Sequence, residues 1–199
     1  MTRLDRFYPI VDSTDWLELM LPLGVRLVQL RIKSGDEDLL SEEIATAKDM
    51  CADHGAQLIV NDHWQIAIEE GCDFIHLGQE DLDDADLEAI RAAGMKLGVS
   101  THDHAELERA LAIDPDYISL GPVWPTILKQ TVSPELGLEH VTEWKEMIGN
   151  VPLCAVGGLT PDRALMAFDA GADIAAVATD ITMNADPERR MQEWLETTK

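Results

Sequence analysis

The sequence predicts an α/β fold in which eight parallel strands, each followed by a helix, close into a compact single-domain TIM barrel over residues 1–199. Short apolar runs rich in β-branched residues recur eight times in 199 residues, about one per 25 residues. Helical patterns fill the intervals, and this alternation is typical of a parallel sheet. The runs are apolar throughout, as expected for strands covered on both faces.

The predicted strands follow one another at similar spacing along the whole chain. They are Tyr8–Val11, Val25–Ile32, Gln57–Val60, Phe74–Leu77, Lys96–Val99, Tyr117–Leu120, Pro152–Val156 and Ile174–Ala178. An open doubly wound sheet is the alternative fold. The glycine fingerprint of dinucleotide-binding sheets does not follow the first strand, which counts against that alternative.

Helix signals separate these strands. One helical face is predicted from the spacing of Leu40, Ile44, Ala47 and Cys51. Gly55 follows where a left-handed C-terminal cap belongs. Asp103 with Glu106 resembles a capping box. Thr160-Pro161 and Asp186-Pro187 each place a cap residue before a proline at the first helical position.

Composition and charge exclude several classes of protein. Acidic residues number 38 and basic residues 15, a formal charge of −23, and 46% of residues are hydrophobic. This is a globular composition whose net charge repels nucleic acid and anionic membranes, so we expect neither as a partner. Cys51, Cys72 and Cys154 lie far apart, which indicates reduced thiols in a cytoplasmic protein. The sequence leaves open whether the protein forms a homo-oligomer.

A basic strand end is the first candidate site. In a TIM barrel the chemistry lies beyond the carboxyl ends of the strands. Gln29, Arg31 and Lys33 alternate along the second predicted strand, so we expect them on one face. Two cations and an amide there would suit a pyrophosphate. The alternative is an edge strand with a solvated basic face.

Two carboxylates follow neighbouring strands. Asp62 comes after the third predicted strand and Asp81 after the fourth. Beside a diphosphate they would form a magnesium site, because Mg²⁺ takes hard oxygen ligands and substrate phosphates. The alternative for Asn61-Asp62 is a turn or helix cap, and Glu80 could compete with Asp81. The acidic residues after it, Asp83, Asp84 and Asp86, are interpreted as a solvated loop.

Later strand ends offer further groups for anions. Ser100 could donate to a phosphate oxygen or begin a helix. Lys129 lies on a long segment between Gly121 and Gly137, interpreted as a lid, and is a third cation or a surface lysine. Gly157-Gly158 and Ala178-Thr179 lie where such barrels often bind phosphate through backbone N–H groups. A plain tight turn is the alternative for the glycines.

Taken together, these segments resemble one enzyme family. QLRIK, LIVND, HLGQEDL, LGVSTH, GPVWPTILK, VGGLT and AVATDI occur in the order and spacing of thiamine phosphate synthases. The resemblance extends from Phe7 to Asp186. It implies the joining of a hydroxymethylpyrimidine diphosphate to a thiazole phosphate, with Mg²⁺ as cofactor and pyrophosphate as the second product. It leaves open whether the thiazole carries a carboxylate.

The resemblance also implies roles for residues. The pyrimidine diphosphate would be held by Gln29, Leu30, Arg31, Ile32, Lys33, Asn61, Ser100 and Lys129. Among these, Arg31, Lys33, Ser100 and Lys129 would be catalytic, and Asp62 and Asp81 would bind the metal. The thiazole phosphate would be held by Thr126, Ile127, Leu128, Gly158, Ala178 and Thr179.

Three residues depart from the family pattern, and other functions share the fold. Leu128 stands where many members carry Thr, Thr179 replaces a common Ser, and Asp180 replaces a small residue beside the expected phosphate. A thiazole tautomerase is one alternative, and a non-catalytic sensor of thiamine intermediates is another. A phosphosugar isomerase or epimerase is a third, although it has no use for two aspartates beside a basic strand.

Overall fold

A computed structural model of the chain describes residues 4–33, 36–126 and 135–199. Eight parallel strands form a closed barrel in sequential order, from β1 next to β2 through to β8 next to β1. The strands are β1 Phe7–Val11, β2 Leu27–Leu30, β3 Gln57–Asn61, β4 Phe74–Leu77, β5 Lys96–Thr101, β6 Tyr117–Leu120, β7 Leu153–Val156 and β8 Ile174–Val177. The predicted fold class is confirmed.

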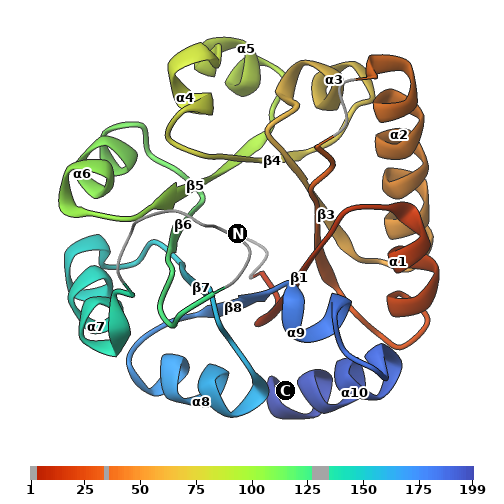
Figure 1. Cartoon of the computed structure of the whole chain (residues 1–199). Coiled ribbons are helices and arrows are strands. Elements are labelled where there is room, and N and C mark those ends of the chain that lie inside the picture. The colour runs from red at the N-terminus through yellow and green to blue at the C-terminus, as the bar shows by residue number, and fades with distance from the viewer. Residues whose placement is uncertain (1–3, 34–35, 127–134) are drawn as a thin grey trace.

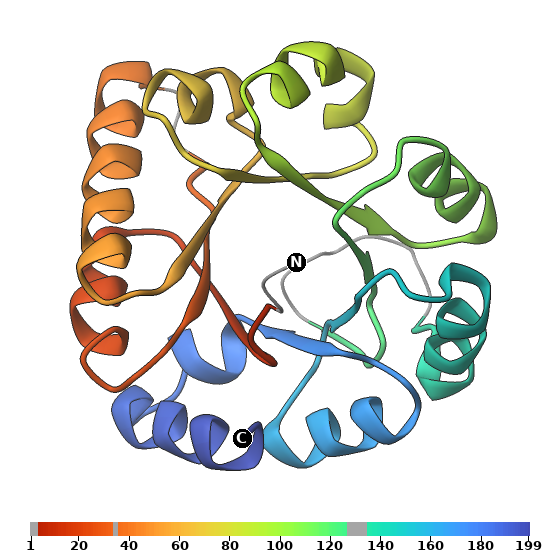
Figure 2. The same cartoon turned by 180° about the vertical axis from the view of Figure 1, so that it is seen from behind.

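Helices form a ring around the barrel, as the two opposite views show (Figures 1 and 2). They are α1 Thr14–Met20, α2 Glu37–Asp53, α3 Trp64–Glu69, α4 Asp81–Asp84, α5 Leu87–Ala92, α6 His104–Ala112, α7 Gly137–Ile148, α8 Pro161–Asp169, α9 Thr179–Thr182 and α10 Pro187–Thr197. The predicted caps hold: the side chains of Asp103, Thr160 and Asp186 each accept a backbone N–H of the first helical turn.

Two apolar layers hold the barrel together, because successive strand residues face opposite sides of the sheet. Outward-facing strand residues pack against the helices, including the predicted face of α2. Inward-facing residues fill the barrel itself and are Tyr8, Leu27, Ile59, Phe74, Tyr117, Cys154, Ile174 and Ala176. The barrel is therefore a packed core, and ligands must bind at its rim.

The second strand is shorter than predicted. β2 ends at Leu30, where it pairs with Val11 of β1 and Val60 of β3. The Arg31 N–H still donates to Val11 O at 2.7 Å, but Ile32 and Lys33 lie outside the ladder. The predicted strand over Val25–Ile32 is wrong at both ends. The length of β2 is set by where β1 and β3 offer hydrogen-bond partners, and the apolar run in the sequence extends beyond those points.

Candidate active site

Two aspartates meet at the carboxyl end of the barrel. Asp62 follows β3, and Asp81 opens α4 after β4. Burial and the neighbouring Asp81 carboxylate raise the pKa of Asp62 to about 6, while Arg31 and His63 oppose the shift. The structure thus brings Asp62, Asp81 and Arg31 together at one place on the rim.

Local backbone geometry orients both carboxylates. Asp62 has a positive φ of 68°, a left-handed conformation that Asp tolerates better than most residues. The Gly78 N–H donates to Asp81 Oδ2 at 3.1 Å, and a Cβ on Gly78 would lie 2.8 Å from the same oxygen. The N-cap of α3 is His63, so the alternative of Asn61 or Asp62 as the helix cap is wrong.

The basic segment after β2 divides into three kinds of position. Arg31 is half-buried beside Asp62. Lys33 is exposed and lies beyond the strand, so the predicted alternation of Gln29, Arg31 and Lys33 along one strand does not reach Lys33. Leu30 is 1% exposed in the layer beneath the helices, and Ile32 packs against that layer. Leu30 can therefore offer a ligand only its backbone, whereas the side chain of Ile32 is partly exposed.

Asn61 ends β3 with its side chain turned into the barrel. The residue is 4% exposed, and its Nδ2 has no hydrogen-bond partner among the residues that the structure describes. A buried amide donor without a partner is costly unless a ligand or water completes it. Asn61 is therefore poised to donate to a molecule at the rim.

Ser100 lies within β5 and does not begin a helix, because α6 starts at His104. Its Oγ lies 2.8 Å from His76 Nε2, and its carbonyl accepts from Gln79 Nε2 at 2.7 Å. The hydroxyl is half-buried at the same end of the barrel as Asn61, so it remains a candidate donor to an anion.

The predicted phosphate turns lie after β7 and β8. Gly157 and Gly158 have φ of 96° and 64°, and a Cβ on Gly158 would lie 2.6 Å from Pro125 O. The Trp124 N–H donates to Gly157 O at 3.1 Å. The close approach of the loop after β6 therefore already requires glycine at Gly158, which supports the tight-turn alternative without excluding a ligand.

The turn after β8 holds Ala178 and Thr179, both half-buried, with Thr179 opening α9. Thr126 follows Trp124 and Pro125, is half-buried and has an interaction partner. Three predicted residues, Ile127, Leu128 and Lys129, lie outside the described residues, so their predicted roles stay predictions.

Asp180, one of the departures from the family pattern, is paired with side chains of α10. Arg190 of α10 binds its carboxylate in a fork, with Nε to Oδ2 at 2.7 Å and Nη2 to Oδ1 at 2.9 Å. Trp194 Nε1 donates to Oδ2 at 2.8 Å. These bonds neutralise the carboxylate locally and anchor α9 to α10, which lies outside it (Figure 1).

Residue patterns did not reveal a set of polar groups inside the barrel. Tyr8, His76 and Tyr117 face inward, and hydrogen bonds link them to Gln29 and Ser100. Alternation along β1, β4 and β6 was the available signal, because each of these residues falls on the inner face. Which of them meet depends on the register of non-adjacent strands, and no local pattern gives that register.

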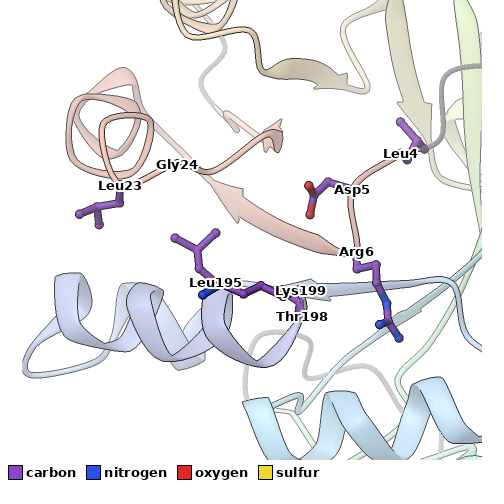
Figure 3. A pocket seen from close by; sticks show the side chains of 8 residues that line it. All are labelled: Leu4, Asp5, Arg6, Leu23, Gly24, Leu195, Thr198 and Lys199. Atoms are coloured by element: carbon purple, nitrogen blue, oxygen red, sulfur yellow. The ribbon is translucent and has the colours of Figure 1, made fainter.

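A hollow lies at the end of the barrel opposite the candidate site (Figure 3). Its lining is Leu4, Asp5, Arg6, Leu23, Gly24, Leu195, Thr198 and Lys199. These residues precede β1 and β2 or end α10, so they belong to the amino-terminal face, where TIM barrels do not place their chemistry.

Among the helices described, none combines the length and apolarity that crossing a bilayer requires.

Comparison with known proteins decides the family. A family model described as thiamine monophosphate synthase matches residues 7–181. The chain belongs to the thiamine monophosphate synthase family. The thiamine-phosphate synthase of Rhizobium etli is 60% identical over 196 residues, 98% of this chain and 96% of that protein. The thiamine-phosphate synthase of Neisseria meningitidis serogroup A is 43% identical over 183 residues, 92% of this chain and 89% of that protein.

Solved structures agree on the fold of this family member. The thiamine phosphate pyrophosphorylase from Pyrococcus furiosus superposes with a TM-score of 0.86 at 24% identity, covering 97% of this chain and 95% of that one. A 3-hexulose-6-phosphate synthase reaches a TM-score of 0.69 at 17% identity. The barrel alone therefore does not decide the reaction. Membership of the thiamine monophosphate synthase family confirms the predicted family and the prediction of a transferase.

Proposed function

We propose that this chain is a single-domain, cytoplasmic thiamine phosphate synthase. It joins 4-amino-2-methyl-5-(diphosphooxymethyl)pyrimidine to a thiazole phosphate and releases pyrophosphate. The observation that carries this proposal is the meeting of Arg31, Asp62 and Asp81 at one rim of the barrel. Asn61, whose buried Nδ2 has no hydrogen-bond partner in the described part of the chain, ends the strand that leads to Asp62.

The donor set at the rim fits Mg²⁺. Two carboxylates crowd together strongly enough to raise the pKa of Asp62, and a divalent cation between them would relieve that repulsion. Among the described residues there is no cluster of three or more His, Cys, Asp and Glu able to hold a metal. Mg²⁺ needs no such cluster, because it keeps several waters and takes further ligands from substrate phosphates.

Each residue has a task in the proposed reaction. The C–O bond between the pyrimidine methylene and the diphosphate breaks, and its electron pair leaves with the diphosphate. Arg31 stabilises the charge that develops on the leaving oxygens. We expect the exposed Lys33 to do the same, and also Lys129, which lies outside the described residues. Asp62 and Asp81 would hold Mg²⁺, which when bound supplies further positive charge to the diphosphate.

The second half of the reaction forms the new bond. The aminopyrimidine ring delocalises the positive charge left on the methylene, and the thiazole nitrogen donates its lone pair to that carbon. No protein nucleophile is needed. Asn61 and Ser100 orient the pyrimidine diphosphate, while Thr126, Gly158 and the Ala178-Thr179 turn receive the thiazole phosphate, so that the two reacting atoms are held together.

One assay separates this function from its alternatives. Purified protein is mixed with both phosphorylated substrates and Mg²⁺, and thiamine phosphate and pyrophosphate are measured. The proposal expects both products in equal amounts. A folded protein that binds the thiazole phosphate saturably without forming product would instead be the sensor. Asp180, one of the departures from the family pattern, has its carboxylate bound by Arg190, so this departure does not favour the sensor.

A further inference from the structure

Five side chains from five strands form one hydrogen-bonded chain across the barrel. Gln29 Nε2 of β2 donates to the Tyr8 hydroxyl of β1 at 2.8 Å, and Tyr8 meets the Tyr117 hydroxyl of β6 at 2.9 Å. Tyr117 lies 2.6 Å from Nδ1 of His76 on β4, and Nε2 of His76 lies 2.8 Å from Ser100 Oγ on β5. Both ends of the chain are residues expected to hold the pyrimidine diphosphate.

This hydrogen-bonded chain is buried along most of its length. Tyr8 is 1% exposed, Tyr117 0% and Gln29 3%. Gly98 of β5 makes room for the Tyr117 ring, since a Cβ there would lie 2.1 Å from it. The rings of His76 and Tyr117 stack at 5.5 Å with an interplanar angle of 19°. Shielded from bulk solvent, these polar groups bond to one another, so the direction of each bond matters.

One direction satisfies every hydroxyl in the chain. Burial raises the pKa of both tyrosines, so each keeps its proton. Tyr8 accepts from Gln29 and can donate to Tyr117, which in turn donates to Nδ1 of His76. In the opposite direction the Tyr8 oxygen would accept two protons, and its own proton would have no acceptor in the chain. Accordingly Nδ1 is an acceptor, and His76 carries its proton on Nε2.

We propose that this hydrogen-bonded chain fixes His76 as the Nε2–H tautomer. His76 then donates to Ser100 Oγ, and the Ser100 hydroxyl proton is directed at the bound diphosphate. His76 and Tyr117 are therefore positioning residues for the pyrimidine diphosphate. This inference rests on the proposed function, because it takes Ser100 as a ligand of that substrate. A serine whose oxygen already accepts a bond has its own proton left to donate to an anion.

The tautomer can be observed directly in the free protein. Nitrogen-15 NMR of the histidine rings distinguishes a protonated from an unprotonated Nδ1, and a His76→Gln variant assigns the His76 signals among the six histidines. The expected result is an unprotonated Nδ1 and a protonated Nε2. A Nδ1–H tautomer or a doubly protonated ring at His76 in the wild type would overturn the inference.

Binding tests the link to Ser100. Calorimetric titration with the pyrimidine diphosphate and Mg²⁺ is done on wild type, Tyr117→Phe, Ser100→Ala and the double variant. Each single change should weaken binding about tenfold, because a hydrogen bond to a charged group is lost or misdirected. The double variant should be no weaker than Ser100→Ala alone. If the double variant loses affinity by the product of the two single-variant factors, Tyr117 acts independently of Ser100, which contradicts the inference.

A matched control uses a buried hydroxyl outside the chain. Thr101 adjoins Ser100, donates to Ser119 O at 3.0 Å and accepts from Trp144 Nε1 at 3.0 Å. Thr101→Val should lower the melting temperature but leave the affinity for the pyrimidine diphosphate and the His76 signals unchanged. If Thr101→Val loses as much affinity as Tyr117→Phe, the Tyr117 effect comes from general destabilisation. Neither measurement depends on turnover. A wild type that forms no thiamine phosphate therefore refutes the proposed function. The NMR and binding measurements still show whether the hydrogen-bonded chain sets the His76 tautomer and acts through Ser100.

Discussion

Asp62 combines two unfavourable features in one residue. Its backbone is left-handed with φ of 68°, and its carboxyl group is half-buried beside Asp81. Each feature costs stability, and such costs persist where the surroundings impose them, most often at functional sites. A bound cation would offset the electrostatic cost but not the backbone cost. The residue is therefore arranged for a charged ligand at the expense of the ligand-free protein.

Replacing either aspartate should raise the Mg²⁺ requirement. We expect Asp62→Ala and Asp81→Ala to increase the half-saturating Mg²⁺ concentration by roughly tenfold or more, since a charged ligand is lost. Thiamine phosphate formation over a Mg²⁺ series measures the effect. Asp83→Ala is the control, because Asp83 lies on the same helix but is exposed and paired with Arg109. An unchanged metal response in both site variants would remove the metal assignment.

The raised pKa of Asp62 makes a prediction for stability without metal. A carboxyl group whose pKa is raised in the folded state contributes stability below its unfolded pKa of about 4, and this is lost as the pH rises through about 6. Asp62→Asn removes the group and suits the left-handed backbone. After allowance for solvent screening, the variant should exceed wild type by about 1–2 kcal/mol at pH 7.5.

Urea unfolding in EDTA measures this difference. At pH 4.5, close to the unfolded pKa, most of the advantage of Asp62→Asn should disappear. A variant that is less stable than wild type at pH 7.5, or equally advantaged at both pH values, would show that the Asp62 carboxylate is not strained by its surroundings.

Arg31 should distinguish the two substrates. Its half-buried side chain lies beside Asp62, on the side of the site assigned to the diphosphate. Arg31→Ala is expected to raise KM for the pyrimidine diphosphate on the order of tenfold to a hundredfold, because a forked, charged contact is lost. KM for the thiazole phosphate should change by less than about threefold. Equal losses for both substrates would contradict the two-subsite arrangement.

At the scale of elements, local signals predicted most of the fold. Strand positions and the caps at Asp103, Thr160 and Asp186 depend on residues within one turn or one strand, so the sequence is enough to find them. The end of β2 was misplaced because it depends on where β1 and β3 stop offering partners. The partner of Asp180 could not be predicted from sequence, because Arg190 lies on another helix, α10, packed against α9.

The same limit applies to the candidate site. Asp62 and Asp81 could be paired from sequence because adjacent strands of a barrel end side by side. The hydrogen-bonded chain that links Gln29 to Ser100 could not be predicted from sequence, because Tyr8 on β1 and Tyr117 on β6 meet across the barrel interior. A residue-type pattern locates groups along the rim, whereas contacts through the core require the closed structure.

The pairing of α9 with α10 should support binding of the thiazole phosphate. Arg190→Met leaves the Asp180 carboxylate without its forked partner, next to the Ala178-Thr179 turn. We expect KM for the thiazole phosphate to rise about three- to tenfold through repulsion, with stability lower by about 1–3 kcal/mol. Steady-state kinetics with each substrate varied in turn measure the effect.

Two further variants separate charge from folding. Asp180→Asn added to Arg190→Met should restore KM for the thiazole phosphate, because the unpaired charge is gone. Arg189→Ala is the matched control, since Arg189 is exposed and pairs only with Glu193 among the described ion pairs. If the double variant keeps the raised KM, the effect comes from the displaced helix and not from the carboxylate.

At the scale of the whole molecule, the charge of −23 acts against both folding and substrate encounter. Self-repulsion destabilises a compact chain, and both proposed substrates are anions that approach a negative surface. The cations Arg31 and Lys33 act only at short range. At low ionic strength the screening length is about 30 Å at 0.01 M, so an approaching substrate experiences the net charge first; near 0.15 M it falls to about 8 Å.

Salt should therefore raise activity before it lowers it. Between about 10 and 150 mM KCl, at fixed free Mg²⁺, we expect kcat/KM for both substrates to increase by roughly two- to fivefold, because screening removes long-range repulsion. The melting temperature should rise by about 2–4 °C for each kcal/mol of repulsion relieved. Choline chloride should reproduce both effects if screening is the cause, whereas an effect of KCl alone would indicate a bound potassium ion. A steep fall in kcat/KM from the lowest salt onward would instead mean that the cations at the rim attract the substrates over a distance at which the acidic surface should dominate.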